Sequence, residues 1–387
     1  MAEKPVWVGV NPDVMKWARE SIGLTIPDVS KRLNIREGTI EEWETGDRKP
    51  TLNTLKKLTN LYKRPLSAFF LPEPPQEQPL PTDFRVLPED ARRPFTRKAL
   101  LAIRRARYLQ SIATELLREE DMTDQFPAFQ KVTLDDDPEL VAERERNRLG
   151  VTISRQSRFR NIYDAFSKWR EILESQHILI LQSRITVAEA RGFSLLDNLL
   201  PVIAVSISDS IRARVFTLFH EYSHILLDIS GICTPESVSP YDTKAQLTER
   251  FCNHFAGAFL VPRIALSEDS NAREILHRGR IDNSLLYEIA NRFKVSTQVV
   301  LRRLLICQFI NREQYEAKLN ELEFQQKVRK PRHGFGMATP KRCITENGRF
   351  FTSVALAAKE KDIITYSDLA DYLAIDLKHL DKVEALL

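Results

Sequence analysis

Hydrophobic residues recur at helical spacing along most of the chain, which predicts a mainly α-helical protein with a small β-sheet, an α+β fold. Residues 13–70 are expected to form five short helices. Two apolar runs, His177–Arg184 and Leu200–Ser206, read instead as strands. The second strand leads into an apolar helix, for which Ser208 or Asp209 is the expected N-cap.

A proline-rich stretch at residues 72–94 divides the chain, because so many prolines exclude helix and favour an extended connector. We therefore predict an all-helical domain over 1–71 and a second domain over 95–310 that opens with several helices. Residues 311–387 are expected to form a C-terminal helical module, with a loop over 331–349.

Composition narrows the class of protein. The chain has 387 residues and a net charge of +4, too small to indicate nucleic-acid binding by the chain as a whole. Its N-terminus has no apolar signal segment, and no apolar run approaches the ~18 residues that a membrane span needs. The four cysteines form no C-x-x-C pair. These features predict a cytoplasmic protein.

The N-terminal domain shows a helix-turn-helix pattern. Thr25 is expected to cap one helix and Asn34 to end it, while the next helix turns Ile40 and Trp43 inward and stops at Gly46. This pattern resembles the Cro/C1-type (XRE) repressor domain, whose W-E-x-G and P-T signatures match Trp43 to Gly46 and Pro50-Thr51. The resemblance implies possible DNA binding.

Charge on this domain leaves two interpretations open. DNA contacts are expected from five side chains, namely Arg32, Arg36, Thr39, Arg48 and Lys49. The predicted recognition helix also carries four carboxylates that would face phosphates, namely Glu37, Glu41, Glu42 and Glu44. The alternative is a protein-docking module with a repressor-like fold.

The strongest chemical signal is H-E-x-x-H, formed by His220, Glu221 and His224 in an apolar helix. Helical spacing puts both imidazoles on one face, where they can reach one metal ion. Glu221 lies beside them, where a carboxylate can take a proton from a metal-bound water. The alternative is that the motif arises by chance on a core helix and has no metal-binding role.

A third ligand is needed to leave one open position for water. We favour Glu249, which lies on the next predicted helix one turn before Asn253. Three other residues are less suitable as the third ligand. Asp228 lies in line with the two histidines, His254 faces a different direction from Glu249, and Glu236 lies in a loop without a pattern.

H-E-x-x-H followed by E-x-x-x-N-x-F-A-x-x-x-x-x-P resembles the ImmA/IrrE family of metallopeptidases, over about residues 160–310. The resemblance implies a gluzincin-like site with His220, His224 and Glu249 as metal ligands and Glu221 as general base. It implies Zn²⁺, with Mn²⁺ and Fe²⁺ as alternatives. Positions 222 and 223, Tyr and Ser, depart from the smaller or apolar pair of many members.

The expected activity is metal-dependent endopeptidase cleavage of a repressor or antitoxin-like DNA-binding protein, which would control transcription. The alternative is a transcriptional regulator or antitoxin-like protein whose peptidase-like domain senses metal or binds a partner without cleavage. An oxyanion donor is expected, and the candidates are Tyr222, Tyr241, His254 and backbone N–H groups.

Residues 285–305 read as helix, short turn and helix, with Ser296 as the cap of the second helix. The basic side chains of Arg302 and Arg303 would also fit a second DNA-binding segment. A similar segment packs on the peptidase core in the family, so the resemblance favours a structural role.

Overall fold

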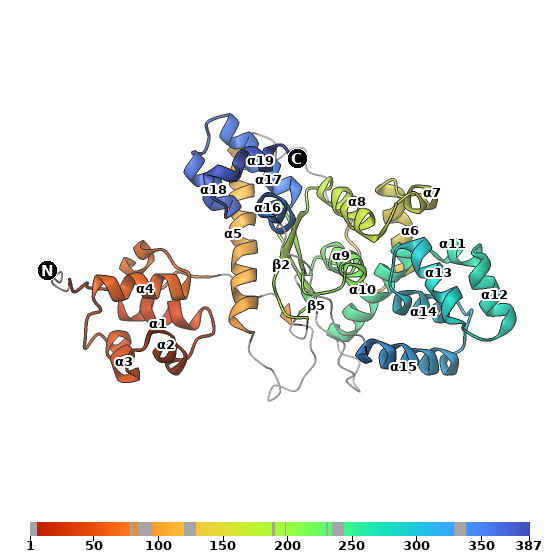
Figure 1. Ribbon diagram of the computed structural model, residues 1–387, viewed down its shortest axis with the longest axis horizontal. Coiled ribbons are helices and arrows are strands. Elements are labelled where there is room, and N and C mark those ends of the chain that lie inside the picture. Colours follow the sequence, from red (N-terminus) through yellow and green to blue (C-terminus); the bar gives the residue numbers. More distant parts are fainter. Residues whose placement is uncertain are drawn as a thin grey trace. The chain divides into compact units, whose positions relative to one another are not determined.

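The computed structural model (Figure 1) describes residues 6–77, 80, 82–83, 95–119, 129–187, 190–197, 199–229, 231–233, 244–328 and 338–387. The chain forms two compact units. Unit 1 comprises Met1–Leu80 and Ala91–Arg104, and unit 2 comprises Pro81–Asp90 and Arg105–Leu387. No helix among the described residues is long and apolar enough to cross a membrane.

Unit 1 contains the five predicted short helices. They are α1 (Pro12–Glu20), α2 (Ile26–Leu33), α3 (Glu37–Thr45), α4 (Leu52–Tyr62) and the 3₁₀ helix η1 (Leu66–Phe70). Thr25 caps α2 by accepting a hydrogen bond from Asp28 N, and Asn34 ends it in the left-handed region. Gly46 ends α3 at φ 89°, a conformation that favours glycine. These local predictions are confirmed.

The described core of unit 1 is mainly apolar and includes a buried ion pair. Ile40 and Trp43 are buried, as predicted. Arg19 Nε lies 2.7 Å from Glu44 Oε1, and the two side chains are only 9% and 7% exposed. Arg19 also donates to Leu24 O at 2.8 Å. The carboxylate of Glu44 is therefore an internal partner of α1, and it does not lie on the exposed face of α3.

Unit 2 is built on a mixed five-stranded sheet in the order β1-β5-β3-β4-β2. The strands are β1 (Thr82–Asp83), β2 (Leu179–Ser183), β3 (Gly192–Leu195), β4 (Val202–Ser206) and β5 (Gly231–Cys233). β2 and β4 are the two predicted strands and pair in parallel, whereas β3 runs antiparallel to both β4 and β5. β1 lies within the predicted linker, most of which falls outside the described residues.

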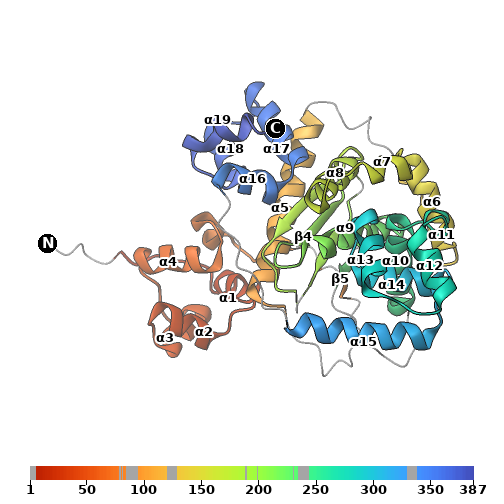
Figure 2. The ribbon, with the colours of Figure 1, turned by 45° about the vertical axis from the view of Figure 1, so that its right-hand side comes forward.

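Helices lie beside this sheet (Figure 2). Those that precede β2 are α5 (Arg97–Glu119), which starts in unit 1, α6 (Pro138–Arg148), α7 (Ile153–Ser157) and α8 (Ile162–Glu174). Those that follow β4 are α9 (Ile211–Leu226), α10 (Lys244–Leu260), α11 (Arg263–Ser267), α12 (Ser270–Arg278), α13 (Asn283–Phe293), α14 (Thr297–Ile306) and α15 (Arg312–Val328). Helix α9 packs on β3 and β4, and α10 packs on α9 and α6.

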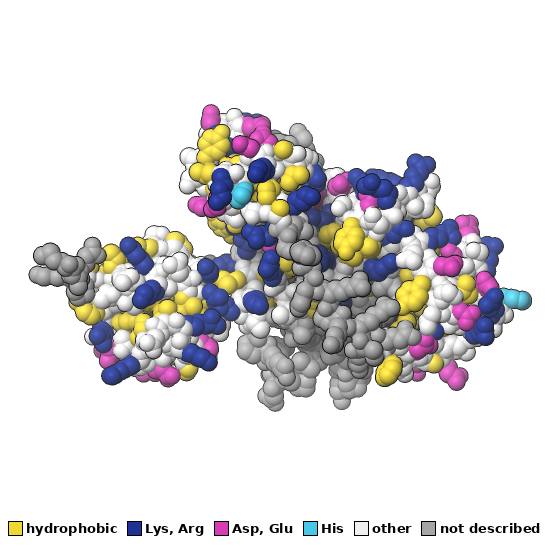
Figure 3. Space-filling view, viewed as in Figure 1, with side chains coloured by type: hydrophobic (Ala, Val, Ile, Leu, Met, Phe, Trp, Pro, Cys, Tyr) yellow, Lys and Arg dark blue, Asp and Glu magenta, His cyan; other side chains and the backbone are white. Residues whose placement is uncertain are grey.

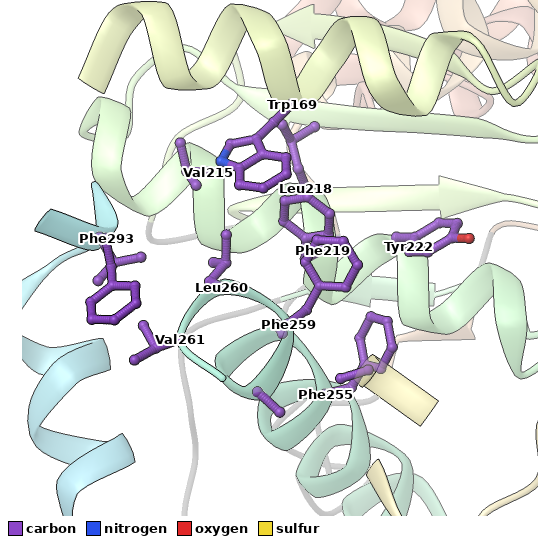
Figure 4. Close-up of a cluster of buried hydrophobic side chains, with 14 of the residues drawn as sticks. Trp169, Val215, Leu218, Phe219, Tyr222, Phe255, Phe259, Leu260, Val261 and Phe293 are labelled. Carbon is purple, nitrogen blue, oxygen red and sulfur yellow. The ribbon is translucent and has the colours of Figure 1, made fainter. Parts of the chain in front are cut away.

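Aromatic side chains fix the contact between α8, α9 and α10 (Figure 4). The rings of Trp169 and Phe219 meet edge to face with centroids 5.0 Å apart, and Phe219 stacks on Phe259 at 4.2 Å. All three side chains are fully buried. Such pairs add about 0.5–1.5 kcal/mol each beyond their area burial, so the two helices that carry the H-E-x-x-H motif and Glu249 are held firmly together.

The C-terminal residues form α16 (Thr339–Asn347), α17 (Arg349–Glu360), α18 (Tyr366–Leu373), the 3₁₀ turn η4 (Leu377–His379) and α19 (Leu380–Glu384). The prediction of a loop over 331–349 is wrong for its second half, because Pro340 lies in the first turn of α16, where proline is tolerated. Helix α16 packs on β2, and Gln182 Nε2 donates to Thr345 O at 3.1 Å.

Candidate metal centre

Helix α9 begins at Ser210, whose hydroxyl accepts a hydrogen bond from Ala213 N. The prediction of Ser208 or Asp209 as the N-cap is therefore wrong, by two residues or by one. Asp209 instead forms an ion pair with Arg191, whose Nη1 lies 2.9 Å from Asp209 Oδ2. The helix then runs into the core, and every residue from Thr217 to Leu226 is buried.

His220, His224 and Glu249 converge on one point, although two different helices carry them. The Nε2 atoms of the two histidines lie 3.3 Å apart. Glu249 on α10 places Oε2 at 3.4 Å from His220 Nε2 and Oε1 at 3.3 Å from His224 Nε2. Among the described residues, this is the group of histidine, cysteine and acidic side chains that can hold a metal ion.

These separations fit a tetrahedral metal ion. Bonds of about 2.0–2.1 Å to nitrogen and oxygen place neighbouring ligand atoms of a tetrahedral site roughly 3.3–3.4 Å apart. The two imidazole nitrogens have this spacing, and each of them has one oxygen of the Glu249 carboxylate at a similar distance. His220 Nδ1 lies 3.1 Å from Asn253 Oδ1. An amide oxygen accepts there, so Nδ1 carries the proton and the Nε2 lone pair faces the ligand triangle. The residues present fit a divalent ion with one open position.

The surroundings of His224 and Glu249 shift the pKa values of both side chains. Burial lowers the pKa of His224, which favours the neutral imidazole that binds metals. Burial alone would raise the pKa of Glu249, but His220 and His224 outweigh it and hold that pKa well below its usual range. A ligand set of two imidazoles and one carboxylate suits Zn²⁺ and, with other geometries, Mn²⁺ or Fe²⁺.

Glu221 is fully buried beside the two histidines in the chain. Strand β3 passes very close to it at Gly192, where a Cβ atom would lie 3.3 Å from Glu221 Oε1 and 2.5 Å from Thr217 Cγ2. The second distance is far below van der Waals contact, so only glycine lets β3 approach α9 here. Sequence reasoning missed β3, and the isolated glycine was the only available signal.

The rival ligands lie elsewhere. Asp228 follows the end of α9 and pairs with Lys131 at 3.3 Å, with 61% of its side chain exposed. His254 Nε2 lies 2.7 Å from Glu139 Oε1, so this imidazole is engaged by α6. Glu236, like the oxyanion candidate Tyr241, lies outside the described residues.

Tyr222 does not serve as an oxyanion donor in this structure. Its hydroxyl donates to Glu145 Oε2 at 2.7 Å and accepts from Arg148 Nη2 at 2.6 Å. Burial, together with the carboxylate of Glu145, raises the pKa of this phenol. His254 is removed from the same set of candidates by its contact with Glu139.

Arg303 is a buried structural residue. It is fully buried on α14 and donates to Glu139 at 2.5 and 3.0 Å and to Val261 O at 2.9 Å. Burial alone would raise the pKa of Glu139, but hydrogen bonds from His254 and Arg303 hold it at about 2. The packing role that the sequence favoured for this segment agrees with these contacts, and Ser296 caps α14 as predicted.

The residues predicted to contact DNA lie on the surface of unit 1. Arg32, Arg36, Arg48 and Lys49 are exposed, and Thr39 is half-buried. Figure 3 shows basic and acidic side chains interspersed on one face of this unit. Sequence reasoning counted four repulsive carboxylates on α3, but Glu44 is neutralised internally by Arg19, and Glu42 lies 3.4 Å from Arg48.

Two family models match the chain. Residues 173–305 match the peptidase M78 family, described as the IrrE N-terminal-like domain. This segment is therefore similar to an IrrE N-terminal-like domain. Residues 15–69 match the helix-turn-helix family, so the predicted pairing of the two domains is confirmed. No curated protein matches the chain. His220, Glu221, His224, Glu249 and Asn253 all lie within the matched IrrE-like segment.

Proposed function

We propose that the protein is a metal-dependent endopeptidase that cleaves a repressor or antitoxin-like DNA-binding protein and thereby controls transcription. The observation that carries this proposal is the convergence of His220, His224 and Glu249. The two Nε2 atoms lie 3.3 Å apart, and each lies 3.3–3.4 Å from one oxygen of the Glu249 carboxylate. The match to a peptidase family supports it independently.

The chain's own side chains have distinct roles in this proposal. His220, His224 and Glu249 would hold the ion, which when bound supplies Lewis acidity and lowers the pKa of a water to about 7. Glu221 takes a proton from the attacking water and later delivers it to the leaving amine. The buried surroundings of Glu221 exclude bulk solvent, which strengthens its interaction with developing charge.

The helix-turn-helix unit would bring the peptidase to its place of action. Matching to a DNA-binding family supports DNA contact through Arg32, Arg36, Thr39, Arg48 and Lys49. A repressor bound at a neighbouring DNA site would then be at high effective concentration for cleavage. This is the basis for proposing a DNA-binding protein as substrate.

The decisive experiment compares the full-length wild type with Glu221→Gln in cells. New protein N-termini are mapped by mass spectrometry after expression of each variant. The proposal expects internal cleavage of a DNA-binding protein with wild type and none with Glu221→Gln. Glu268→Gln is the matched control, because the exposed Glu268 follows α11 and undergoes the same chemical change.

Two other outcomes would contradict the proposal. Cleavage that persists in Glu221→Gln would remove the general base from the mechanism. Absence of any wild-type-dependent cleavage, together with specific DNA retention by both variants, would favour a regulator whose peptidase-like domain senses metal or binds a partner.

A further inference from the structure

Tyr222 connects the helix of the two histidines, α9, to α6. It follows Glu221 in α9, and its ring is fully buried. Its hydroxyl meets Glu145 and Arg148, both near the end of α6. Tyr222 lies in the chain between Glu221 and His224. Its hydroxyl therefore connects the H-E-x-x-H helix to α6 by hydrogen bonds.

Glu145 makes this tie specific. Its carboxylate is fully buried, and Oε2 accepts from both Tyr222 and Arg148 Nε, the latter at 2.8 Å. Its other oxygen lies 3.8 Å from Arg144 Nε. A buried carboxylate is costly unless hydrogen bonds and opposite charge compensate it. The buried carboxylate of Glu145 requires the Tyr222 hydroxyl as a hydrogen-bond donor, and this requirement fixes the position of the hydroxyl.

Helix α6 is also fixed to α10, which carries Glu249. Arg146 Nη1 donates to Phe259 O at 2.6 Å. At the other end of α6, Glu139 contacts His254 on α10 at 2.7 Å. Helix α6 therefore joins the helix of the two histidines to the helix of the third ligand.

We propose that α6 is a brace for the metal centre and that Tyr222 is the positioning residue that couples this brace to α9. The inference rests on the proposed metal site. The brace fixes the rotation of α9 relative to α10, and this rotation sets the distances from Glu249 to both imidazoles. Helix α6 lies before the matched segment 173–305, so the metal-binding unit extends beyond that segment.

The test is the zinc affinity of the full chain, measured by competition with a chelator. Tyr222→Phe removes only the hydroxyl, and its zinc affinity should fall about tenfold, as for residues that orient ligands from outside the first shell. Tyr62→Phe is the matched control, because Tyr62 is equally buried but belongs to unit 1. It should bind zinc within about twofold of the wild type.

The melting temperature of the metal-free protein shows whether the Tyr222 hydroxyl positions the metal ligands or only stabilises the packing of α9. If Tyr222→Phe lowered the melting temperature of the metal-free chain but bound zinc like the wild type, the brace would be overturned. Glu145→Gln keeps an acceptor for the hydroxyl and should stay within about threefold of the wild-type affinity. A loss in Glu145→Gln without one in Tyr222→Phe would also overturn the proposal, since the coupling would bypass Tyr222.

A further variant, His224→Ala, distinguishes a failure of the proposed metal site from a failure of the proposed brace. If the wild type fails to bind zinc, the proposed metal site itself fails. If the wild type binds zinc, His224→Ala loses it and Tyr222→Phe equals the wild type, then only the brace is wrong.

Discussion

The metal centre and the helix-turn-helix unit arrange their predicted functional residues in opposite ways. In the metal centre, His220, Glu221 and His224 are fully buried and point inward. In unit 1, Arg32, Arg36, Arg48 and Lys49 are exposed. Both sites were predicted from short sequence motifs, but only the first brings its side chains together in a buried cluster, with the Nε2 atoms of His220 and His224 3.3 Å apart.

This difference predicts how each site responds to substitution. A buried constellation depends on a few atoms at set distances, so the loss of one atom removes the function. A surface for a polyanion sums many similar contacts, so each residue contributes modestly and in a salt-dependent way. The following predictions test this contrast, from the largest effect to the smallest.

The largest effect is expected for Glu221→Gln. The amide cannot accept the proton of the attacking water, so peptide cleavage should fall about a thousandfold while the metal is retained. Cleavage kinetics and metal content measured on the same preparation check this. A variant that lost the metal as well would show that Glu221 also holds the site together.

The buried pair of Arg19 and Glu44 in unit 1 should respond to substitution as the metal centre does, and not as the exposed surface of the same unit does. Glu44→Gln leaves Arg19 buried with a weakened partner and should lower the free energy of unfolding of unit 1 by about 3 kcal/mol. The exposed Glu42→Gln should change it by less than about 0.5 kcal/mol. Denaturant unfolding followed by tryptophan fluorescence tests both, and equal effects would break the contrast.

Acid should weaken unit 2 through Glu139. Its pKa is lowered from 4.5 to about 2 in the folded protein, so its stabilisation is complete above pH 4.5 and is lost as pH falls toward 2. Partial exposure limits the effect to about 1–2 kcal/mol. Glu139→Gln should flatten the stability profile of unit 2 over this range. An unchanged profile would contradict the assigned pairing with His254 and Arg303.

The smallest single effects are expected on the exposed face of unit 1. If Arg36 contacts a phosphate, Arg36→Ala should weaken DNA binding about tenfold and reduce the slope of log affinity against log salt by about 1. Lys382→Ala, exposed on α19, serves as the control and should change neither quantity. Salt-independent or absent DNA binding would favour the protein-docking interpretation.

Local patterns predicted the elements that depend on nearby residues. The caps Thr25 and Ser296, the stop at Gly46 and the strands β2 and β4 follow from sequence neighbours, and the structure has them. The helical spacing of His220 and His224 likewise predicted two imidazoles that meet, and their Nε2 atoms do so at 3.3 Å.

Partners distant in sequence were not predictable. Glu44 looked like a repulsive surface charge because its partner Arg19 lies 25 residues away. Tyr222 was considered as an oxyanion donor because Glu145, 77 residues away, leaves no local signal. Strand β3 was missed because it has only four residues, all buried, and so shows no alternation. Glu249 was chosen by its helix and motif, and its role as a ligand stays a prediction.

The central claim is that two helices assemble one three-ligand metal site. Its most direct test is the metal content of purified wild type beside His224→Ala and Glu249→Ala, after equilibration with zinc or manganese. We predict about one ion per wild-type chain and its loss in both variants. Wild type without a bound ion, or a stoichiometric ion that survives in Glu249→Ala, would contradict the site.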